Sequence, residues 1–201
     1  MNAAEIIDQI KLNEKYWGGE AITPQQIEAL AHLSAAGYTE VVSTLLLEPV
    51  AAHRDLRAEA YRKTYAHLVY GALFFCLRPD PDLYNLLLTG VLGIADPSSI
   101  QYGAVALQQV RPVEQIVSDL FVIAGQNPEN LELLSHIAWL FYWLGFSEDG
   151  GWWERIINIG PDGDWIKLYK ENTKPETDPR ETARAAQNVA KFMDAYYQVA
   201  Y

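Results

Sequence analysis

The sequence has little of what several classes of protein require. Its 201 residues include one cysteine, Cys76, so no disulfide can form within the chain, and this usage fits a reducing compartment. No basic segment followed by an apolar core opens the chain, so no signal peptide is predicted. The longest apolar stretches, 68–77 and 133–146, are shorter than the ~20 residues that cross a bilayer. These features predict a cytoplasmic protein that does not bind membranes.

Basic residues are also scarce. There are 15 lysines and arginines against 26 aspartates and glutamates, which gives a formal net charge of −11. A chain this acidic is poorly suited to direct contact with nucleic acid or with an anionic membrane. Half of the residues are hydrophobic, which is enough for a sizeable core and argues against intrinsic disorder.

Prolines are spaced regularly through the middle of the chain. Intervals of 16, 15 and 16 residues separate Pro81, Pro97, Pro112 and Pro128. Because proline is tolerated at the first position of a helix, and an Asp or Asn before it can cap that helix, each X-Pro pair predicts a helix start. The start at Pro112 is the weakest, since an arginine precedes it. The same pattern recurs at Thr23-Pro24 and Asp178-Pro179.

Apolar residues at helical spacing follow these starts, so the chain is expected to be mainly α-helical. Helices of equal length joined by short turns form antiparallel hairpins, here 80–111 and 112–144. Two arrangements fit: an α-solenoid-like (HEAT-like) array or an irregular helical bundle. The predicted organisation is one domain, 1–201, with a hairpin array at 23–144, a β-hairpin insert at 145–172 and a C-terminal helix at 178–201.

Two local details complete the prediction. Helices are expected at 3–16, at 23–36 ending before Gly37, at 39–52 with a break or kink at Pro49, at 55–78, and at 179–200. The runs 153–159 and 164–170 are rich in β-forming residues and flank a Gly-Pro-Asp-Gly turn. They predict a β-hairpin near 153–170.

Motifs that carry chemistry are missing. The chain has no nucleophile elbow, no phosphate-binding loop and no His-Glu-x-x-His pair. His136 lies one helical turn after Glu132 but lacks further ligands, so a helix-contact role is favoured over a metal site. Cys76 stands in an apolar run and is expected to be inert. No catalytic residue, metal or cofactor is therefore predicted.

Acidic residues are concentrated in one stretch. Residues 113–164 hold nine acids and one base, Arg155. Tryptophans occur in and beside the same stretch, where Trp139 and Trp143 are expected in the core. Exposed aromatics beside charge of one sign are typical of protein interfaces. The predicted partner-binding residues are Glu148, Asp149, Trp152, Trp153, Glu154, Asp162, Asp164 and Trp165. For the paired tryptophans, a packing role within the insert remains an equal alternative.

These features favour a non-enzymatic protein that binds a basic protein partner one-to-one. The most concrete version is an acidic immunity or antitoxin-type inhibitor, which covers the active surface of a toxin acting on nucleic acid. A helical-repeat scaffold or adaptor is the first alternative, and an enzyme with an unrecognised site is the second.

Overall fold

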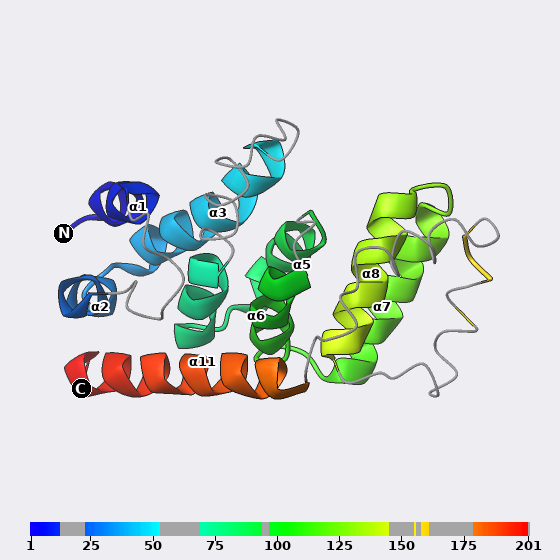
Figure 1. The fold of residues 1–201 in the computed structure, drawn as a ribbon. Helices are drawn as coiled ribbons and strands as arrows, with labels where there is room; N and C mark the ends of the chain where they lie inside the picture. The colour runs from blue at the N-terminus through cyan, green and yellow to red at the C-terminus, as the bar shows by residue number, and fades with distance from the viewer. Residues whose placement is uncertain are drawn as a thin grey trace.

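The computed structural model describes residues 1–12, 23–52, 69–93, 97–144, 155, 158–160 and 179–200. Over these residues the protein is mainly helical, which confirms the predicted class, and none of them lies in a β-strand (Figure 1). A helix at 69–77 carries no label. The labelled elements are α1 (Ala3–Leu12), α2 (Pro24–Ala31), α3 (Ala35–Ala52), the 3-10 turn η2 (Pro81–Leu83), α5 (Tyr84–Leu92), α6 (Pro97–Leu107), α7 (Val113–Gln126), α8 (Leu131–Trp143) and α11 (Pro179–Ala200).

Four of the predicted helix starts are confirmed. The Thr23 hydroxyl accepts a hydrogen bond from the backbone N–H of Gln26, whose side chain accepts one from the Thr23 N–H. This reciprocal capping box satisfies two N–H groups that the first turn leaves unpaired. The Asp80 side chain caps η2 by accepting a single hydrogen bond from the Asp82 N–H, and α6 and α11 begin at Pro97 and Pro179.

The predicted start at Pro128 is wrong by three residues. The Asn130 N–H donates to the Asn127 carbonyl at 3.1 Å, so Pro128 lies inside a turn. The helix begins only at Leu131, where the Asn130 side chain accepts from the Leu133 N–H. The chain thus offers two asparagines as caps, and the second one caps α8. Pro112 likewise precedes α7, which has no side-chain cap.

The expected helix end at Gly37 is also wrong. Helix α2 stops at Ala31, and α3 begins at Ala35, so Gly37 lies in the first turn of α3. The Ser34 hydroxyl accepts from the Gly37 N–H at 3.1 Å and caps this helix. Helix α3 then runs without a break to Ala52, so Pro49 does not end it.

The predicted β-hairpin is not supported. Arg155 is helical, and residues 158–160 form a turn, so the described part of the predicted strand 153–159 is not extended. The rest of the expected insert, including all of 164–170, lies outside the described residues.

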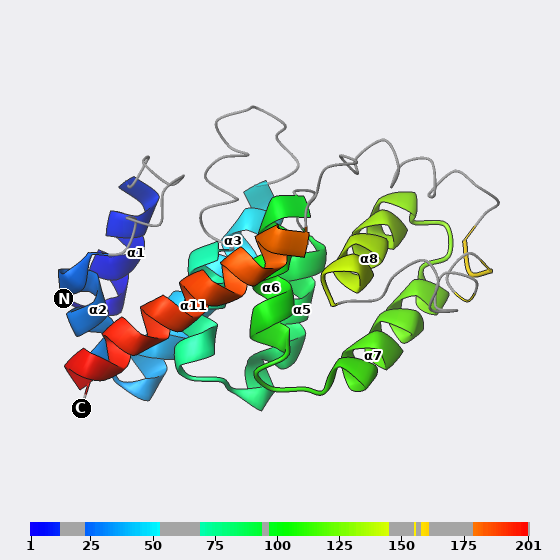
Figure 2. The same cartoon turned by 60° about the horizontal axis from the view of Figure 1, so that its bottom comes forward.

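The hairpins lie side by side. Helix α5 packs on α6, α7 packs on α8, and α6 contacts α8, which joins the two hairpins. On the other side, α5 contacts α3 and α3 contacts α1 (Figure 1). Helix α11 runs back along the helices and contacts α6 and α2, so its C-terminal end lies beside the N-terminal helices (Figure 2).

Buried residues of all these helices form one hydrophobic core. Helix α8 is covered on two sides, because it packs on α7 and α6, and every residue from 134 to 141 is buried. Trp139 and Trp143 are 2 % and 3 % exposed, which confirms their predicted place in the core. On α11, Val189 and Tyr196 are buried, whereas Ala190, the neighbour of Val189 in the chain, is exposed. Across the described ranges no helix has the length and apolar character needed to cross a bilayer.

Candidate interaction surface

None of the predicted partner-binding residues is placed by the structure. All eight lie outside the described residues: Glu148, Asp149, Trp152, Trp153, Glu154, Asp162, Asp164 and Trp165. Their proposed role therefore stays a prediction. Four other acids of the same stretch are described, on the α7–α8 hairpin, together with the base Arg155.

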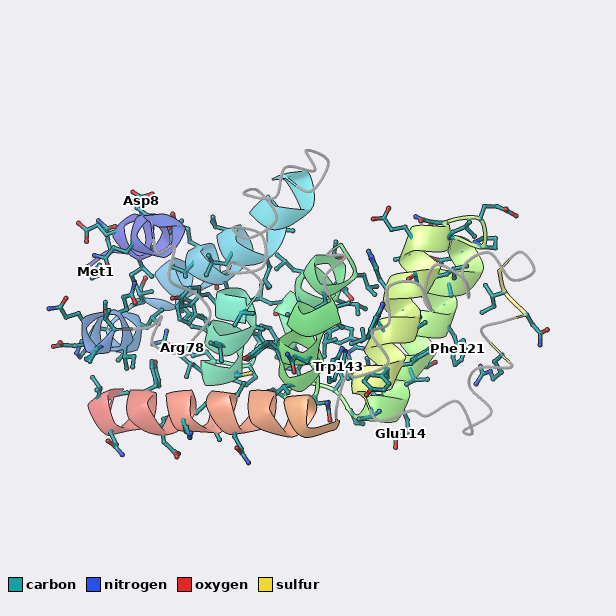
Figure 3. The ribbon with its side chains drawn as sticks, viewed as in Figure 1. Met1, Asp8, Arg78, Glu114, Phe121 and Trp143 are labelled. Atoms are coloured by element: carbon teal, nitrogen blue, oxygen red, sulfur yellow. The ribbon has the colours of Figure 1, made fainter. Side chains whose placement is uncertain are left out.

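Two of these acids lie where a helix favours a negative charge. Glu114 is in the first turn of α7 and Glu132 in the first turn of α8, so each faces the partial positive charge of a helix N-terminus. Glu129 lies in the turn between these helices and is exposed, as is Glu132. Glu114 is exposed too and points away from the helices (Figure 3). These three carboxylates are thus solvated, two of them with a local structural reason for their position.

The fourth acid, Asp119, belongs to a polar cluster where the two hairpins meet. Its carboxylate accepts a hydrogen bond from the Tyr84 hydroxyl at 2.8 Å and pairs with the Arg111 guanidinium at 3.0 Å. The same guanidinium lies over the Tyr84 ring, 4.0 Å from its centroid. Burial raises the pKa of Tyr84, and the bond to Asp119 raises that pKa further. The cluster fastens the start of α5 to α7.

Stacking on an aromatic ring is common to every arginine whose side chain the structure describes. Arg78 lies 4.9 Å from the Tyr38 centroid and donates to the Leu33 carbonyl. Arg111 stacks on Tyr84 as above, and Arg155 lies 4.1 Å from the centroid of Phe121. A planar guanidinium suits such stacking better than an ammonium group does. These cations are therefore used in contacts within the chain.

His136 fills a structural role in the described part of the chain. It is 6 % exposed, and its Nδ1 lies 2.7 Å from the Leu92 carbonyl, to which it donates. The bond connects α8 to the end of α5, as expected for a histidine at a helix contact. Among the described side chains, no group of three or more possible metal ligands comes together.

Cys76 is fully buried in the helix at 69–77. This burial fits its place in an apolar run of the sequence. Loss of hydration raises the pKa of the thiol to about 12, because the thiolate would have to form in an apolar environment. At neutral pH the side chain is an uncharged core residue.

Comparisons of the chain with protein-family models, with curated proteins and with solved structures found no match.

Proposed function

We propose that this protein is an acidic inhibitor of the immunity or antitoxin type, which binds a basic protein partner one-to-one and occludes its active surface. One observation carries the proposal: residues 113–164 hold nine acids and one base. That base, Arg155, is stacked on Phe121, while Glu114, Glu129 and Glu132 are exposed. These three carboxylates are thus accessible to a cationic partner.

Attraction between opposite charges would steer a basic partner toward the acidic surface. An enzyme that acts on nucleic acid presents a basic cleft to its substrate, and an acidic surface can occupy that cleft in the substrate's place. Charge complementarity raises the association rate and selects the partner, whereas buried aromatic side chains slow dissociation. In this proposal the acids of 148–164 supply the steering, and Trp152 or Trp153 supplies the anchor.

The arrangement of the hairpins favours a second candidate. Hairpins α5–α6 and α7–α8 lie side by side, an arrangement that suits an α-solenoid-like stack. Such arrays act as scaffolds, which hold a peptide of a larger protein along one face. For a scaffold, binding would depend on apolar side chains and would change little with salt.

The deciding experiment compares two charge reversals of equal size. Glu148→Lys with Asp149→Lys reverses acids inside the acidic stretch. Asp8→Lys with Glu40→Lys reverses exposed acids on α1 and α3, outside it. Lysine is a good helix former, so the control pair should keep its helices.

Each variant is immobilised and used to capture proteins from a lysate of the source cells. The expected partner is a basic protein that the wild type and the control pair retain and that the test pair loses. Its complex should be one-to-one by light scattering, and a basic product of the neighbouring reading frame is the first protein to assay directly.

With the purified partner, the association rate is measured as salt rises from low ionic strength to 0.15 M, where the Debye length is about 8 Å. The test pair should slow association by roughly tenfold and flatten its salt dependence. Equal effects of the two pairs would show that net charge alone matters and would overturn the acidic stretch as the binding surface. A salt-independent association rate would favour the scaffold.

A further inference from the structure

Helix α11 lies across other helices of the chain and buries one narrow face. It contacts α2 and α6 and crosses both of them (Figure 2). Among the α11 side chains that the structure describes, those of Val189, Met193, Tyr196 and Ala200 are buried or half-buried, and all the others are exposed. Their spacing of four, three and four residues places them on one face of the helix. Amphipathic helices bind apolar surfaces of other proteins through the same spacing.

The surface that α11 covers is held together by contacts that do not involve α11. We call this surface the α11 seat: the parts of α2 and α6 that contact α11, with Tyr38 of α3 beside them. The Arg78 guanidinium donates to the carbonyls of Ala31 and Leu33 at the end of α2, at 3.4 and 3.2 Å (Figure 3). It also stacks on the Tyr38 ring, 4.9 Å from its centroid. Because these contacts join α2 to α3 and to the helix at 69–77, the seat keeps its shape if α11 leaves.

One polar group at the seat lacks a full hydrogen bond. The Tyr38 hydroxyl is buried, and it makes no hydrogen bond of good geometry with the described residues. Burial raises the pKa of Tyr38, the nearby Arg78 offsets that rise only in part, and Tyr196 of α11 is among the groups that add to it. A buried hydroxyl without a good hydrogen bond is destabilising, and water could satisfy it once α11 moves away. The closed arrangement therefore carries a local cost that opening relieves.

Helix α11 is far less buried than the core helix α8. Every residue of α8 from 134 to 141 is buried, whereas on α11 the chain neighbours of the two buried residues Val189 and Tyr196 include Ala190 and Tyr197, which are exposed. Elements with few buried apolar contacts open at a smaller free energy than the core. We therefore expect α11 to detach while the rest of the helices stay folded.

We propose that α11 is an autoinhibitory helix: in the free protein it occupies a seat that binds an amphipathic helix of a partner protein, and the partner's helix displaces it. The chemistry of that partner helix is defined by α11 itself, with apolar residues at i, i+4, i+7 and i+11 and an aromatic ring at i+7. A tethered helix competes at an effective concentration of up to about 1 mM, so only a helix that binds more tightly than α11 is admitted. The acidic stretch plays no part in this inference, which can therefore fail separately from the proposed function.

The first test uses the wild-type chain without any partner. Hydrogen exchange is followed in native protein at low, increasing concentrations of urea. The amides of α11 should exchange through an opening that leaves α5, α6 and α8 protected and that depends less steeply on urea. Exchange of α11 and α8 with the same free energy and the same urea dependence would show that α11 is an integral part of the core and would overturn the proposal.

The second test asks whether the vacated seat binds a helix from another molecule. The full-length variant Val189→Asp places a carboxylate on the packing face of α11 and should release it, whereas the matched control Ala190→Asp changes an exposed neighbour. A fluorescent peptide of residues 179–200 is titrated with each protein, and its anisotropy is measured. The Val189→Asp protein should bind this peptide at least roughly tenfold more tightly than the wild type or the control does. A peptide that itself carries Val189→Asp should not bind, and one that carries Ala190→Asp should bind as the wild-type peptide does.

The remaining outcomes identify other roles for α11. A Val189→Asp protein that stays helical by far-UV circular dichroism but does not bind the peptide overturns the proposal. Loss of the whole helical signal in Val189→Asp overturns it as well, because the fold would then require α11. Light scattering tests a different occupant: a wild-type dimer that Val189→Asp dissociates would assign α11 to the seat of a second copy and would overturn the autoinhibitory role.

Discussion

Substitution by alanine should change the free energy of unfolding in opposite directions at two glycines, Gly90 and Gly125. Gly90 lies on α5 where that helix crosses α3, and a Cβ there would be 2.9 Å from the Leu46 carbonyl oxygen. Gly125 lies near the end of α7, and a Cβ there would meet nothing within 4 Å. Alanine is the better helix former at both positions, by up to ~1 kcal/mol. Only packing therefore distinguishes the two sites.

The magnitudes follow from what each new methyl group meets. At Gly90 the obstacle is backbone, which cannot rotate away, so overpacking of about 1–3 kcal/mol or more outweighs the propensity gain. We expect Gly90→Ala to lower the free energy of unfolding by about 1–2 kcal/mol. Gly125→Ala should raise it by a few tenths to about 1 kcal/mol. For a chain of this length, about 1 kcal/mol shifts the melting temperature by roughly 2–4 °C.

Gly71, on the helix at 69–77, tests a second contact with Leu46 of α3, in which the obstacle is a side chain. Its Cβ would lie 2.8 Å from Leu46 Cδ2, which belongs to a side chain. Leu46→Ala costs about 2–5 kcal/mol by itself, because that side chain is fully buried. In the Leu46→Ala background, Gly71→Ala should become neutral or stabilising, whereas Gly90→Ala should stay destabilising.

The assay is urea unfolding followed by far-UV circular dichroism, with the helical signal of each native variant as the check that it folds. The refuting result is a Gly90→Ala protein as stable as the wild type, alongside a stabilised Gly125→Ala protein. It would mean that α5 does not cross α3 at Leu46 and that the side-by-side arrangement of these helices is wrong.

Three further predictions concern single contacts. Thr23→Ala should cost ~1 kcal/mol in urea unfolding, because α2 loses its capping box. Tyr84→Phe should cost about 1–2 kcal/mol, since the Asp119 carboxylate loses a donor, and an unchanged midpoint would argue against the cluster. Cys76 should resist a bulky thiol reagent until the protein unfolds. Burial raises the pKa of this thiol from 9.0, its value in an unfolded chain, to about 12, so its contribution to stability is complete below pH 9.0 and is lost as the pH rises toward 12. Cys76→Ala should make the measured loss of stability over this range shallower.

Helix starts were predictable where the signal is local. A capping residue and a proline act on the N–H groups of the next turn, so Thr23-Pro24 and Asp80-Pro81 could be interpreted without knowledge of the fold. The same reasoning failed where two caps compete. Asn127 and Asn130 are equally good capping residues, and the first instead donates its side-chain amide to the Ile123 carbonyl. Which of the two asparagines caps α8 depends on the conformation of the whole turn 127–130.

The prediction of a helix end at Gly37 was wrong for a related reason. Glycine is a frequent helix terminator because it adopts a left-handed conformation easily. Gly37 does not use that conformation, and Ser34 caps a helix that contains it. The sequence Leu-Ser-Ala-Ala-Gly held both signals, and the cap three residues earlier determined the structure.

Contacts between distant elements carried no signal in the sequence. Arg78 donates to the Leu33 carbonyl across 45 positions, and His136 reaches the Leu92 carbonyl across 44. Neither spacing predicts a contact, because each depends on how the helices cross. The stacked arginines were missed for the same reason.

The contacts of the described acids indicate which part of the acidic stretch is available to bind a partner through its charge. Residues 113–144 carry four acids and no base, and 145–164 carry five acids and one base, so each half has the same excess of four. In the first half, Glu114 and Glu132 favour their own helix termini, and Asp119 is paired with Arg111. Three of its four acids are thus accounted for by the fold. If the negative charge serves to bind a basic partner, the acids that do so should lie in 145–164. Reversal of Glu148 and Asp149 should therefore reduce binding more than reversal of Glu114 and Glu132.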